Sequence, residues 1–416
     1  MSYKSLDSSS SHKENRKIEN VLVLQGGGSL GAFGCGVFKA LVKEKIKIDI
    51  VAGTSIGAIN AAIIAGSKSK QSEVGLENFW LELAESTIKL IHDKLSFFYD
   101  FQRNTLDYKK ISSSPVNAAF FGVRKMFTPR WDLQYMFKDK EYFLPSKWTY
   151  LYDHTPLANT LEKYIDYKKI SPSSNSKNGF AEKTTTNTYN SNTRLIITSV
   201  NVLTAKPLVF DSYKIPIESK HLLASSGYPS YGFPWVELEN SVHGWDGSLL
   251  SNTPVREIIY VSPRNDKNIF IVENYSRKID SLPANMTEVL DRVKDIIFSD
   301  KTMHNLKMSK VMTRQIQLIE KLYDFFEKAD NKSRVLSEDV QNKIKKEYHN
   351  LVYNYGAEIL SVTRIIRDRL ENPNVSKNAD FSTKTIKELI LQGERNALKS
   401  IKHFKENKIY NNASKL

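Results

Sequence analysis

The sequence predicts an α/β fold with a mainly parallel central sheet, because two strand patterns and two helix patterns alternate near its start. Residues 21–25 form a short apolar run, rich in β-branched side chains, that ends at glycines as a buried parallel strand does. Residues 30–45 place apolar side chains at helical spacing, residues 48–52 repeat the strand pattern, and residues 58–65 predict a second helix. This strand–helix–strand–helix order is typical of parallel α/β folds.

Later segments are expected to extend this sheet and to surround it. Strands are predicted at residues 195–202, 207–210 and 268–273. Residues 79–152 are dense in aromatic side chains, which indicates either core helices packed on the sheet or apolar surface that lines an acyl pocket or touches lipid. These aromatic residues include Phe97, Phe98, Tyr99, Phe101, Phe120, Phe121, Trp131, Tyr135 and Trp148.

The chain beyond Met286 is predicted to be mostly helical and is rich in lysine. Ser382 or Thr383 is suited to cap a final helix. We expect these helices to pack on the core, because their apolar faces need burial; an oligomer interface or a membrane contact is the alternative. The apolar faces are marked by Val289, Val293, Ile296, Ile297, Ile316, Ile319, Leu322, Phe326, Ile386, Leu389, Ile390, Leu398 and Ile401.

Composition and termini limit the class of protein. Of the 416 residues, 40% are hydrophobic and 11% aromatic, so the chain is too apolar to be disordered throughout. Residues 1–17 lack the apolar core of a signal peptide and are expected to form a disordered tail. Residues 48–66 are apolar but contain Asp49 and Asn60, so a buried strand and helix of a soluble protein are expected there rather than a membrane span.

Cysteine content and charge indicate the compartment and the partners. Cys35 is the only cysteine, so no internal disulfide forms, no thiol cluster is available for a metal, and a reducing, cytoplasmic location is expected. The net charge of +14 favours anionic partners, either membrane lipid or nucleic acid, although a lysine-rich proteome has the same effect. No zinc-finger spacing, basic zipper or RNA-recognition motif is present, so nucleic acid is not expected.

The first motif that carries chemistry is Gly-Gly-Gly-Ser-Leu-Gly at residues 26–31, which ends at Gly31. Successive glycines let backbone N–H groups face a ligand at the positive end of a helix, so the loop can bind a phosphate or stabilise an oxyanion. The motif also matches the dinucleotide pattern G-x-G-x-x-G, with Asp49 near the distance expected for a ribose-binding acid. Taken alone, it leaves an oxidoreductase and a hydrolase open.

The second motif, Gly-Thr-Ser-Ile-Gly at residues 53–57, favours a hydrolase. It follows a strand and precedes a helix of small residues, which is the context of a nucleophile elbow. There Gly53 and Gly57 permit the sharp turn that raises the Ser55 hydroxyl above the sheet edge. Asp49 lies at the start of the second strand, whereas a ribose-binding acid lies at its end. Ser55 is therefore predicted to be a nucleophile.

A nucleophilic serine needs a base, and Asp246 is the predicted one. Gly247, the next residue, can adopt a conformation barred to other residues and leave the carboxylate free to point into a site. An aspartate with an ordinary pKa of about 3.9 is a poor base, so partial burial beside Ser55 is expected. On this local pattern a structural turn aspartate is equally open. His243 is the alternative base, although the order Ser, acid, late His of α/β-hydrolases is not matched.

These three motifs, in this order, resemble those of the patatin-like phospholipases. The resemblance implies a patatin-like three-layer sandwich and a Ser55–Asp246 dyad without histidine. It also implies an oxyanion hole made by the amides of Gly26, Gly27 and Gly28, and no metal or cofactor. The implied substrate is a lipid or another acyl ester, cleaved in the manner of a phospholipase A or lysophospholipase. A non-catalytic lipid-binding or scaffold protein on the same fold is the alternative.

The resemblance runs from about residue 21 to about residue 404 and implies a domain organisation. It predicts an acyl hydrolase domain at residues 18–275, interrupted by an exposed insertion loop at residues 171–193. A helical C-terminal extension at residues 276–416 is expected to pack on this domain. Peripheral contact with an anionic membrane is also expected, and oligomerisation stays open.

Two positions depart from the family's pattern. Leu30 stands where an arginine is frequent, which removes a charged group near the oxyanion hole. Ser248 stands where glycine or alanine is usual, and a small serine is not expected to block the turn.

Overall fold

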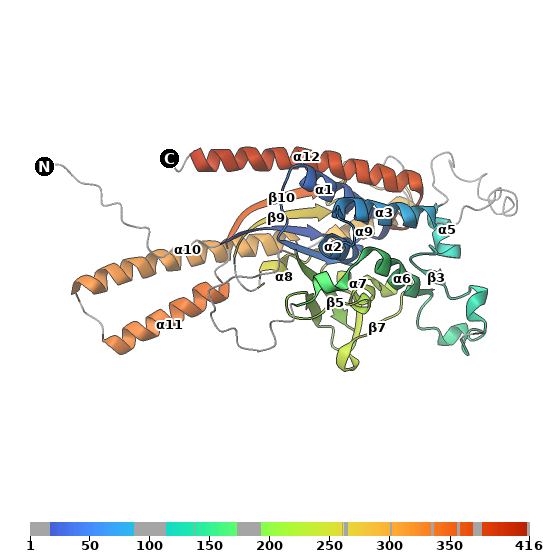
Figure 1. The fold of residues 1–416 in the computed structure, drawn as a ribbon, viewed down its shortest axis with the longest axis horizontal. Helices are drawn as coiled ribbons and strands as arrows, with labels where there is room; N and C mark the ends of the chain where they lie inside the picture. The colour runs from blue at the N-terminus through green and yellow to red at the C-terminus, as the bar shows by residue number, and fades with distance from the viewer. Residues whose placement is uncertain are drawn as a thin grey trace.

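The computed structural model describes residues 17–86, 114–137, 139–172, 193–259, 261, 265–299, 302–333, 337–355, 358–368 and 377–413. Its centre is an eight-stranded sheet in the order β10-β9-β1-β2-β5-β8-β7, with β6 also paired to β5 (Figure 1). The predicted N-terminal tail except for Lys17, most of the predicted insertion loop, and the aromatic residues from Phe97 to Phe101 lie outside the described residues.

The centre of the sheet is parallel and one side of it is antiparallel. The parallel strands are β10 Ile359–Ile366, β9 Asp266–Glu273, β1 Ile18–Leu24, β2 Ile50–Thr54 and β5 Arg194–Asn201. The antiparallel strands are β6 Pro207–Asp211 and β8 His243–Asp246, both against β5, and β7 Val236–Glu237 against β8. A separate two-stranded sheet joins β3 Thr128–Pro129 to β4 Tyr152–Asp153. The mainly parallel sheet predicted from the sequence is confirmed.

Both faces of the central strands are covered by helices, which makes the fold a three-layer sandwich. In β1, Leu22 and Leu24 belong to the core on one face, whereas Val21 and Val23 belong to the core on the other. This burial on two faces explains the continuous apolar runs in the sequence. The first face is covered by α1 Ala32–Lys43, α2 Ile56–Gly66, α3 Ser72–Glu85, α7 Ser219–Ser226 and α12 Thr383–Ala413 (Figure 1). The second face is covered by α8 Val255–Ile259, on which α10 Thr302–Ser333 packs.

The C-terminal extension contributes to the sheet as well as covering it. The mostly helical prediction missed β10, which pairs in parallel with β9 at the edge of the sheet. The sequence of β10, ILSVTRII, is rich in the β-branched residues that are typical of strands, but it lies within a lysine-rich and otherwise helical region. The predicted cap of the last helix is confirmed, because Thr385 N donates to Ser382 Oγ at 3.3 Å. Ile386, Leu389 and Ile390 are buried as predicted.

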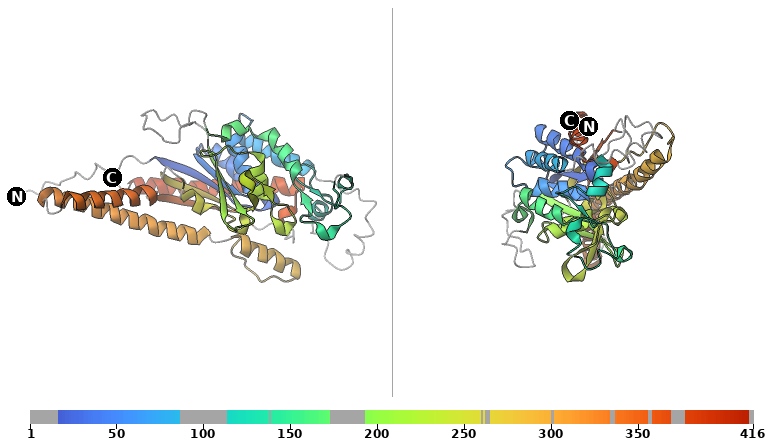
Figure 2. Two further views of the ribbon diagram at one scale, coloured as in Figure 1. Left: turned by 90° about the horizontal axis from the view of Figure 1, so that it is seen from below. Right: turned by 90° about the vertical axis from the view of Figure 1, so that its right-hand side faces the viewer.

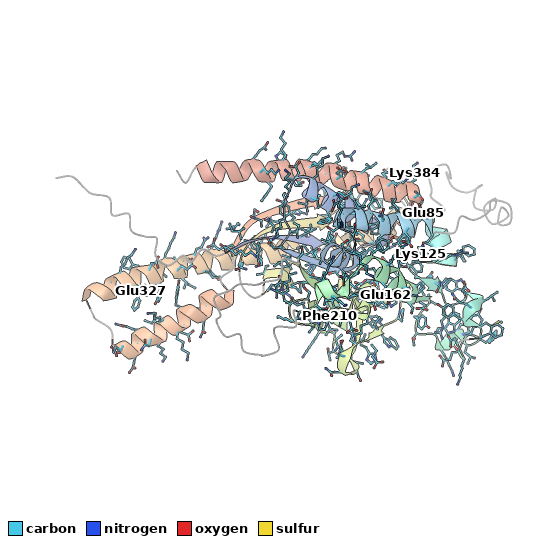
Figure 3. All side chains as sticks on the ribbon, viewed as in Figure 1. Glu85, Lys125, Glu162, Phe210, Glu327 and Lys384 are labelled. Atoms are coloured by element: carbon cyan, nitrogen blue, oxygen red, sulfur yellow. The ribbon has the colours of Figure 1, made fainter. Side chains whose placement is uncertain are left out.

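The other helices of the extension bury less of their apolar faces than expected, although Ile316 of α10 is buried. In α9 Met286–Ser299, Val293 is 44% exposed and Ile296 is 59% exposed, so the prediction that this face packs on the core is wrong. Helices α10 and α11 Glu338–Tyr355 form a hairpin that projects from the core (Figure 2). Glu327 marks its projecting part in Figure 3. Within the described part of the chain, no helix has the length and apolar character needed to cross a membrane.

Candidate active site

Ser55 occupies a strained turn between β2 and α2. Its backbone has φ 59° and ψ −131°, a region that non-glycine residues rarely adopt. Close packing holds the turn: a Cβ on Gly53 would lie 2.2 Å from the Gly57 carbonyl carbon, and one on Gly57 would lie 2.2 Å from Leu24 O. The Ser55 N–H also donates to Ser225 Oγ at 3.1 Å. The strand–turn–helix context expected of a nucleophile elbow is therefore present.

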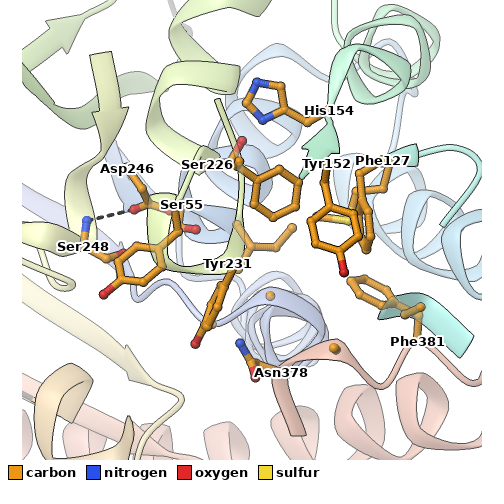
Figure 4. Close-up of a pocket in the computed structure, with 18 of the residues that line it drawn as sticks. Ser55, Phe127, Tyr152, His154, Ser226, Tyr231, Asp246, Ser248, Asn378 and Phe381 are labelled. Carbon is orange, nitrogen blue, oxygen red and sulfur yellow. Dashed lines mark hydrogen bonds between the residues drawn. The ribbon is translucent and has the colours of Figure 1, made fainter. Parts of the chain in front are cut away.

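Sheet topology brings Asp246 to Ser55. Strand β2 pairs with β5 as far as Thr54 opposite Thr198, and the next residue of β5, Ser199, pairs with Asp246 of β8. Because β6 overlaps both of these partners along β5, it occupies one edge of β5 while β2 and β8 share the other. Asp246 thus enters the sheet just where β2 ends, and its carboxyl lies beside the Ser55 side chain (Figure 4).

The Asp246 carboxyl is 1% exposed, and this burial raises its pKa to about 6, although contacts with Ser248 and Ser55 lower it. Oδ1 accepts a hydrogen bond from Ser248 N at 2.8 Å. Oδ2 is buried and has no hydrogen-bond partner among the described residues. The Ser55 hydroxyl is near enough to affect the pKa, yet it does not reach hydrogen-bond geometry with Oδ2. The site therefore holds a weakly acidic carboxyl, with one open oxygen, next to a serine.

Gly247 is needed for a reason other than the predicted one. The described glycines with positive φ are Gly27, Gly28, Gly122 and Gly232, so Gly247 does not use a conformation barred to other residues. Instead, a Cβ at this position would lie 2.7 Å from the carbonyl oxygen of Thr198 on β5. A glycine is required because β8 passes too close to β5 for a side chain.

The glycine loop presents two residues to the site. Gly27 and Gly28 line the cavity beside Ser55, and Gly28 has φ +57°. The Gly26 N–H donates instead to the carbonyl oxygen of Asn252 at 3.4 Å. Of the three amides predicted to form an oxyanion hole, the Gly26 amide is therefore already used within the protein, and those of Gly27 and Gly28 stay candidates.

Ser55, Asp246 and the glycine loop share one cavity of about 230 Å³. Its walls are largely apolar and aromatic, and include Phe127, Leu157, Tyr228, Phe233, Phe298 and Phe381 (Figure 4). Phe127 and Tyr152, from the aromatic segment at residues 79–152, line this cavity. This agrees with the interpretation that part of the segment lines a pocket. The other interpretation also holds in part, because Phe79 and Trp80 of α3 are fully buried in the core.

The C-terminal extension forms a wall that the motifs did not reveal. A Cβ on Gly28 would lie 2.2 Å from Asn378 O, so the turn η9 Lys377–Ala379 is packed directly on the glycine loop. Ser29 Oγ donates to Lys377 O at 3.0 Å and ties the two segments together. Lys294 of α9 also lines the cavity. No local pattern around these residues distinguishes them from an ordinary surface helix and turn.

No histidine in the described part of the chain is seen to pair with Ser55. His243 is three residues before Asp246 on β8, so the two side chains leave opposite faces of the strand, and His243 does not line the cavity. His221 Nδ1 accepts from Glu218 N at 2.9 Å and caps α7. His154 does line the cavity, but burial lowers its pKa to about 4, and its ring stacks on Phe233 at 5.6 Å. It is a neutral part of the wall that the sequence did not single out.

Asp49 does not behave as a ribose-binding acid. Its carboxylate accepts from Asn20 N at 2.9 Å at the amino ends of β1 and β2. The glycine loop follows the carboxyl end of β1, at the other edge of the sheet. The dinucleotide alternative therefore lacks the acid that it requires near the loop.

The fold and the cavity place the chain among the α/β proteins that carry a serine at a sharp turn from a strand to a helix. A family model, patatin-like phospholipase, matches residues 22–259, more than half of the chain. The chain belongs to the patatin-like phospholipase family.

Individual relatives match over short segments. Lysophospholipase nte1 of Aspergillus terreus is 57% identical over 44 residues, which is 11% of this chain and 3% of the relative. Patatin-like phospholipase domain-containing protein 7 of Rattus norvegicus is 39% identical over 72 residues, 17% of this chain and 5% of the relative. The matched part is thus a small fraction of these relatives' length. The crystal structure of VipD from Legionella pneumophila is similar at a TM-score of 0.37 and 14% identity, over 93% of this chain and 67% of that one.

Proposed function

We propose that the protein hydrolyses acyl esters of lipids, with Ser55 as nucleophile and Asp246 as base. The observation that carries the proposal is a buried carboxyl with a pKa raised to about 6 beside a serine on a strained elbow. An apolar cavity surrounds both groups and suits an acyl chain. Membership of the patatin-like phospholipase family supports a lipid as the substrate.

In the proposed mechanism, Oδ2 of Asp246 accepts the proton of the Ser55 hydroxyl as Oγ attacks the acyl carbonyl carbon. The amides of Gly27 and Gly28 donate to the developing oxyanion, and each such donor contributes about 3–4 kcal/mol to lowering the barrier. Asp246 then passes the proton to the leaving alcohol, and an acyl-enzyme remains. Water attacks this ester with Asp246 again as base, which releases the fatty acid and restores Ser55.

The test is hydrolysis of p-nitrophenyl esters of increasing acyl length by the wild type, Ser55→Ala and Asp246→Asn. Both variants are expected to lose at least a thousandfold in kcat while keeping the circular dichroism spectrum of the wild type. Ser69→Ala and Asp132→Asn, at exposed positions, are the matched controls and should keep full activity. An Asp246→Asn variant with the wild-type rate would refute the dyad. A wild type inactive on every ester would favour the non-catalytic lipid-binding alternative.

Membrane contact is proposed for the segment that joins α5 Ser114–Phe121 to β4. Here Phe137 is 87% exposed and Phe143 is 72% exposed, with exposed Lys140 and Lys147 nearby. The segment is continuous with the cavity wall, because Tyr152 OH donates to the carbonyl oxygen of Ala119 at 2.9 Å and both residues line the cavity. Apolar side chains with basic neighbours at the rim of an acyl cavity suit an anionic lipid surface.

Vesicle pelleting tests this contact. The wild type is expected to sediment with vesicles of anionic phospholipid, less so at 0.5 M salt, and Phe137→Ser/Phe143→Ser is expected to reduce binding about tenfold. Leu203→Ser, 81% exposed on the turn after β5, is the control and should bind as the wild type does. Equal loss in both variants would show that the segment is not a specific contact.

A further inference from the structure

Helix α9 has its polar side inward, which is the reverse of an ordinary surface helix. Asp291 and Asp295 are 5% and 6% exposed, and both are paired with the buried Lys377, at 3.1 and 2.6 Å. Apolar residues such as Ile296 face outward instead. In this orientation the single lysine of α9, Lys294, lines the cavity of the proposed active site.

Lys294 is the one lysine or arginine among the described residues that line the cavity. Its ammonium group lies 3.4 Å from Asn378 Oδ1 and 5.4 Å from the centroid of the Tyr231 ring. Two of its contacts are thus with uncharged groups. Burial lowers the pKa of Lys294, as does the nearby charge of Lys377, whereas the charge of Asp291 raises it.

Two further donors accompany Lys294 in the same wall. The Tyr231 hydroxyl is buried and has no hydrogen-bond partner in the part of the chain that the structure describes, although Asn378 is near enough to lower its pKa. Asn378 accepts from Lys294 through Oδ1, which leaves the amide Nδ2 as a donor. Figure 4 shows the Tyr231 and Asn378 side chains next to one another at the cavity. An ammonium, a phenol O–H and an amide N–H grouped in this way match the oxygens of a phosphate.

We propose that Lys294, Tyr231 and Asn378 form a phosphate subsite that selects phospholipids or lysophospholipids over neutral acylglycerols. The inference rests on the proposed function of the same cavity, since the ester of the bound lipid would be cleaved at Ser55. Lys294 and Asn378 lie in the C-terminal extension, outside the segment matched by the family model. Two of the three subsite residues therefore come from the extension, whereas Tyr231, Ser55 and Asp246 lie in the matched segment.

Binding is measured first in a Ser55→Ala background, so that the result does not depend on catalysis. Dodecylphosphocholine, which has no ester, is compared with a dodecyl polyethylene glycol ether of the same chain length. Lys294→Met is expected to weaken the phosphocholine ligand at least tenfold and leave the neutral ligand unchanged, and Tyr231→Phe to weaken it less. Lys294→Arg should restore most of the affinity because it keeps the charge. Lys278→Met, at an exposed lysine outside the cavity, is the control.

Kinetics then separate this proposal from the proposed function. Lys294→Met is expected to raise the ratio of KM for a lysophospholipid to KM for p-nitrophenyl butyrate at least tenfold, because only the first substrate carries a phosphate. Equal affinity of Lys294→Met for both dodecyl ligands, or loss of both, would overturn the subsite. Inorganic phosphate that competed as well as dodecylphosphocholine would assign the site to free phosphate and overturn the lipid proposal. Wild-type inactivity on every ester would refute the hydrolase, and the binding result would still decide the subsite.

Discussion

In the proposed mechanism Asp246 acts as a base without the help of a histidine, and burial of its carboxyl is what makes this role feasible. Each unit of pKa shift corresponds to about 1.4 kcal/mol, so raising an aspartate toward neutrality is a substantial change in proton affinity. The open Oδ2 is the atom on which that affinity is available to Ser55. The same burial has consequences for activity and for stability, and both can be measured.

The rate should depend on the ionisation of Asp246. Because its pKa is raised to about 6, kcat/KM on a short p-nitrophenyl ester is expected to be constant above pH 7 and to fall about tenfold per pH unit below 6. The measurement is kcat/KM between pH 4.5 and 8.5, with circular dichroism to show that the fold persists. A profile that stays flat down to pH 5 would contradict the assignment.

Asp246 should also lower the stability of the folded protein at neutral pH. Its folded pKa of about 6 exceeds the ordinary value of 3.8, so the folded state binds the proton more tightly than the unfolded state. The cost is full above pH 6 and disappears as pH falls toward 4. Asp246→Asn is therefore expected to stabilise the protein by about 1–3 kcal/mol at pH 8, and less at pH 5. Thermal unfolding of both proteins at the two pH values measures this, and an equal or lower melting temperature at pH 8 would be contrary evidence.

Single residues were predictable where a motif fixes both residue type and spacing. Gly53, Ser55 and Gly57 carry such a motif, and the structure shows the turn that they imply. The physical reason predicted for Gly247 was wrong. A glycine is required there because β5 lies close to it, and not because of its own backbone conformation. His154 has no local signal at all, since only the folded chain places it in the cavity wall.

Among the secondary-structure elements, the turn η9 packs directly on the glycine loop of the site. It rests on the glycine loop through Asn378 O and is held from behind by the Lys377 ion pairs. The element has three residues, so it cannot hold its own position and depends on those two charges of α9.

Lys377→Met is expected to destabilise the protein by about 3–5 kcal/mol, because it leaves Asp291 and Asp295 buried without their cation. Esterase activity should fall with it as Asn378 loses its place on the glycine loop. Lys384→Met, at an exposed position of α12, is the control. Adding Asp291→Asn and Asp295→Asn to Lys377→Met should recover part of the stability, since the unpaired charges are removed. A Lys377→Met protein as stable as the wild type would refute this role.

Elements were predictable from the sequence when they lie in the middle of the sheet. Strands β1, β5 and β9 are buried on two faces, and each therefore contains a short run of three or four consecutive apolar residues. The edge strand β10 has a half-buried pattern and was missed. Helix α9 was assigned the wrong face, because helical periodicity reports that one side is apolar and not which side faces the core.

At the scale of the whole molecule, the family segment and the C-terminal extension form a single structure. Helix α12 packs along α1, and a Cβ on Gly36 of α1 would lie 1.9 Å from Ile390 O of α12. Strand β10 completes the sheet on one side. The boundary predicted near residue 275 divides the sequence by resemblance, while the core and the cavity continue across it. Local sequence patterns do not show which strands from distant segments become neighbours in the sheet.

The parts of the C-terminal extension are expected to differ in how much they contribute to activity and solubility. Tyr323 of α10 and Tyr348 of α11 stack with their ring centroids 3.8 Å apart, so residues 324–347 can be replaced by a short Gly/Ser turn without separating the two helices. This variant should keep esterase activity within about twofold of the wild type. A protein ending at residue 376 should lose both activity and solubility, because it exposes the face of α1 that α12 covers. Activity assays and gel filtration of the two proteins check this, and a soluble, active truncation would show that the family segment is self-sufficient.

The contact of Asn378 with Gly28 also bears on when the protein becomes competent during its synthesis. The glycine loop and the elbow leave the ribosome before the wall that completes the cavity, which follows hundreds of residues later. While those residues are being made, a nascent chain carries the proposed nucleophile without a finished site around it. The proposed hydrolase activity is therefore expected only after the chain has been made as far as Phe381 and has folded back onto the glycine loop.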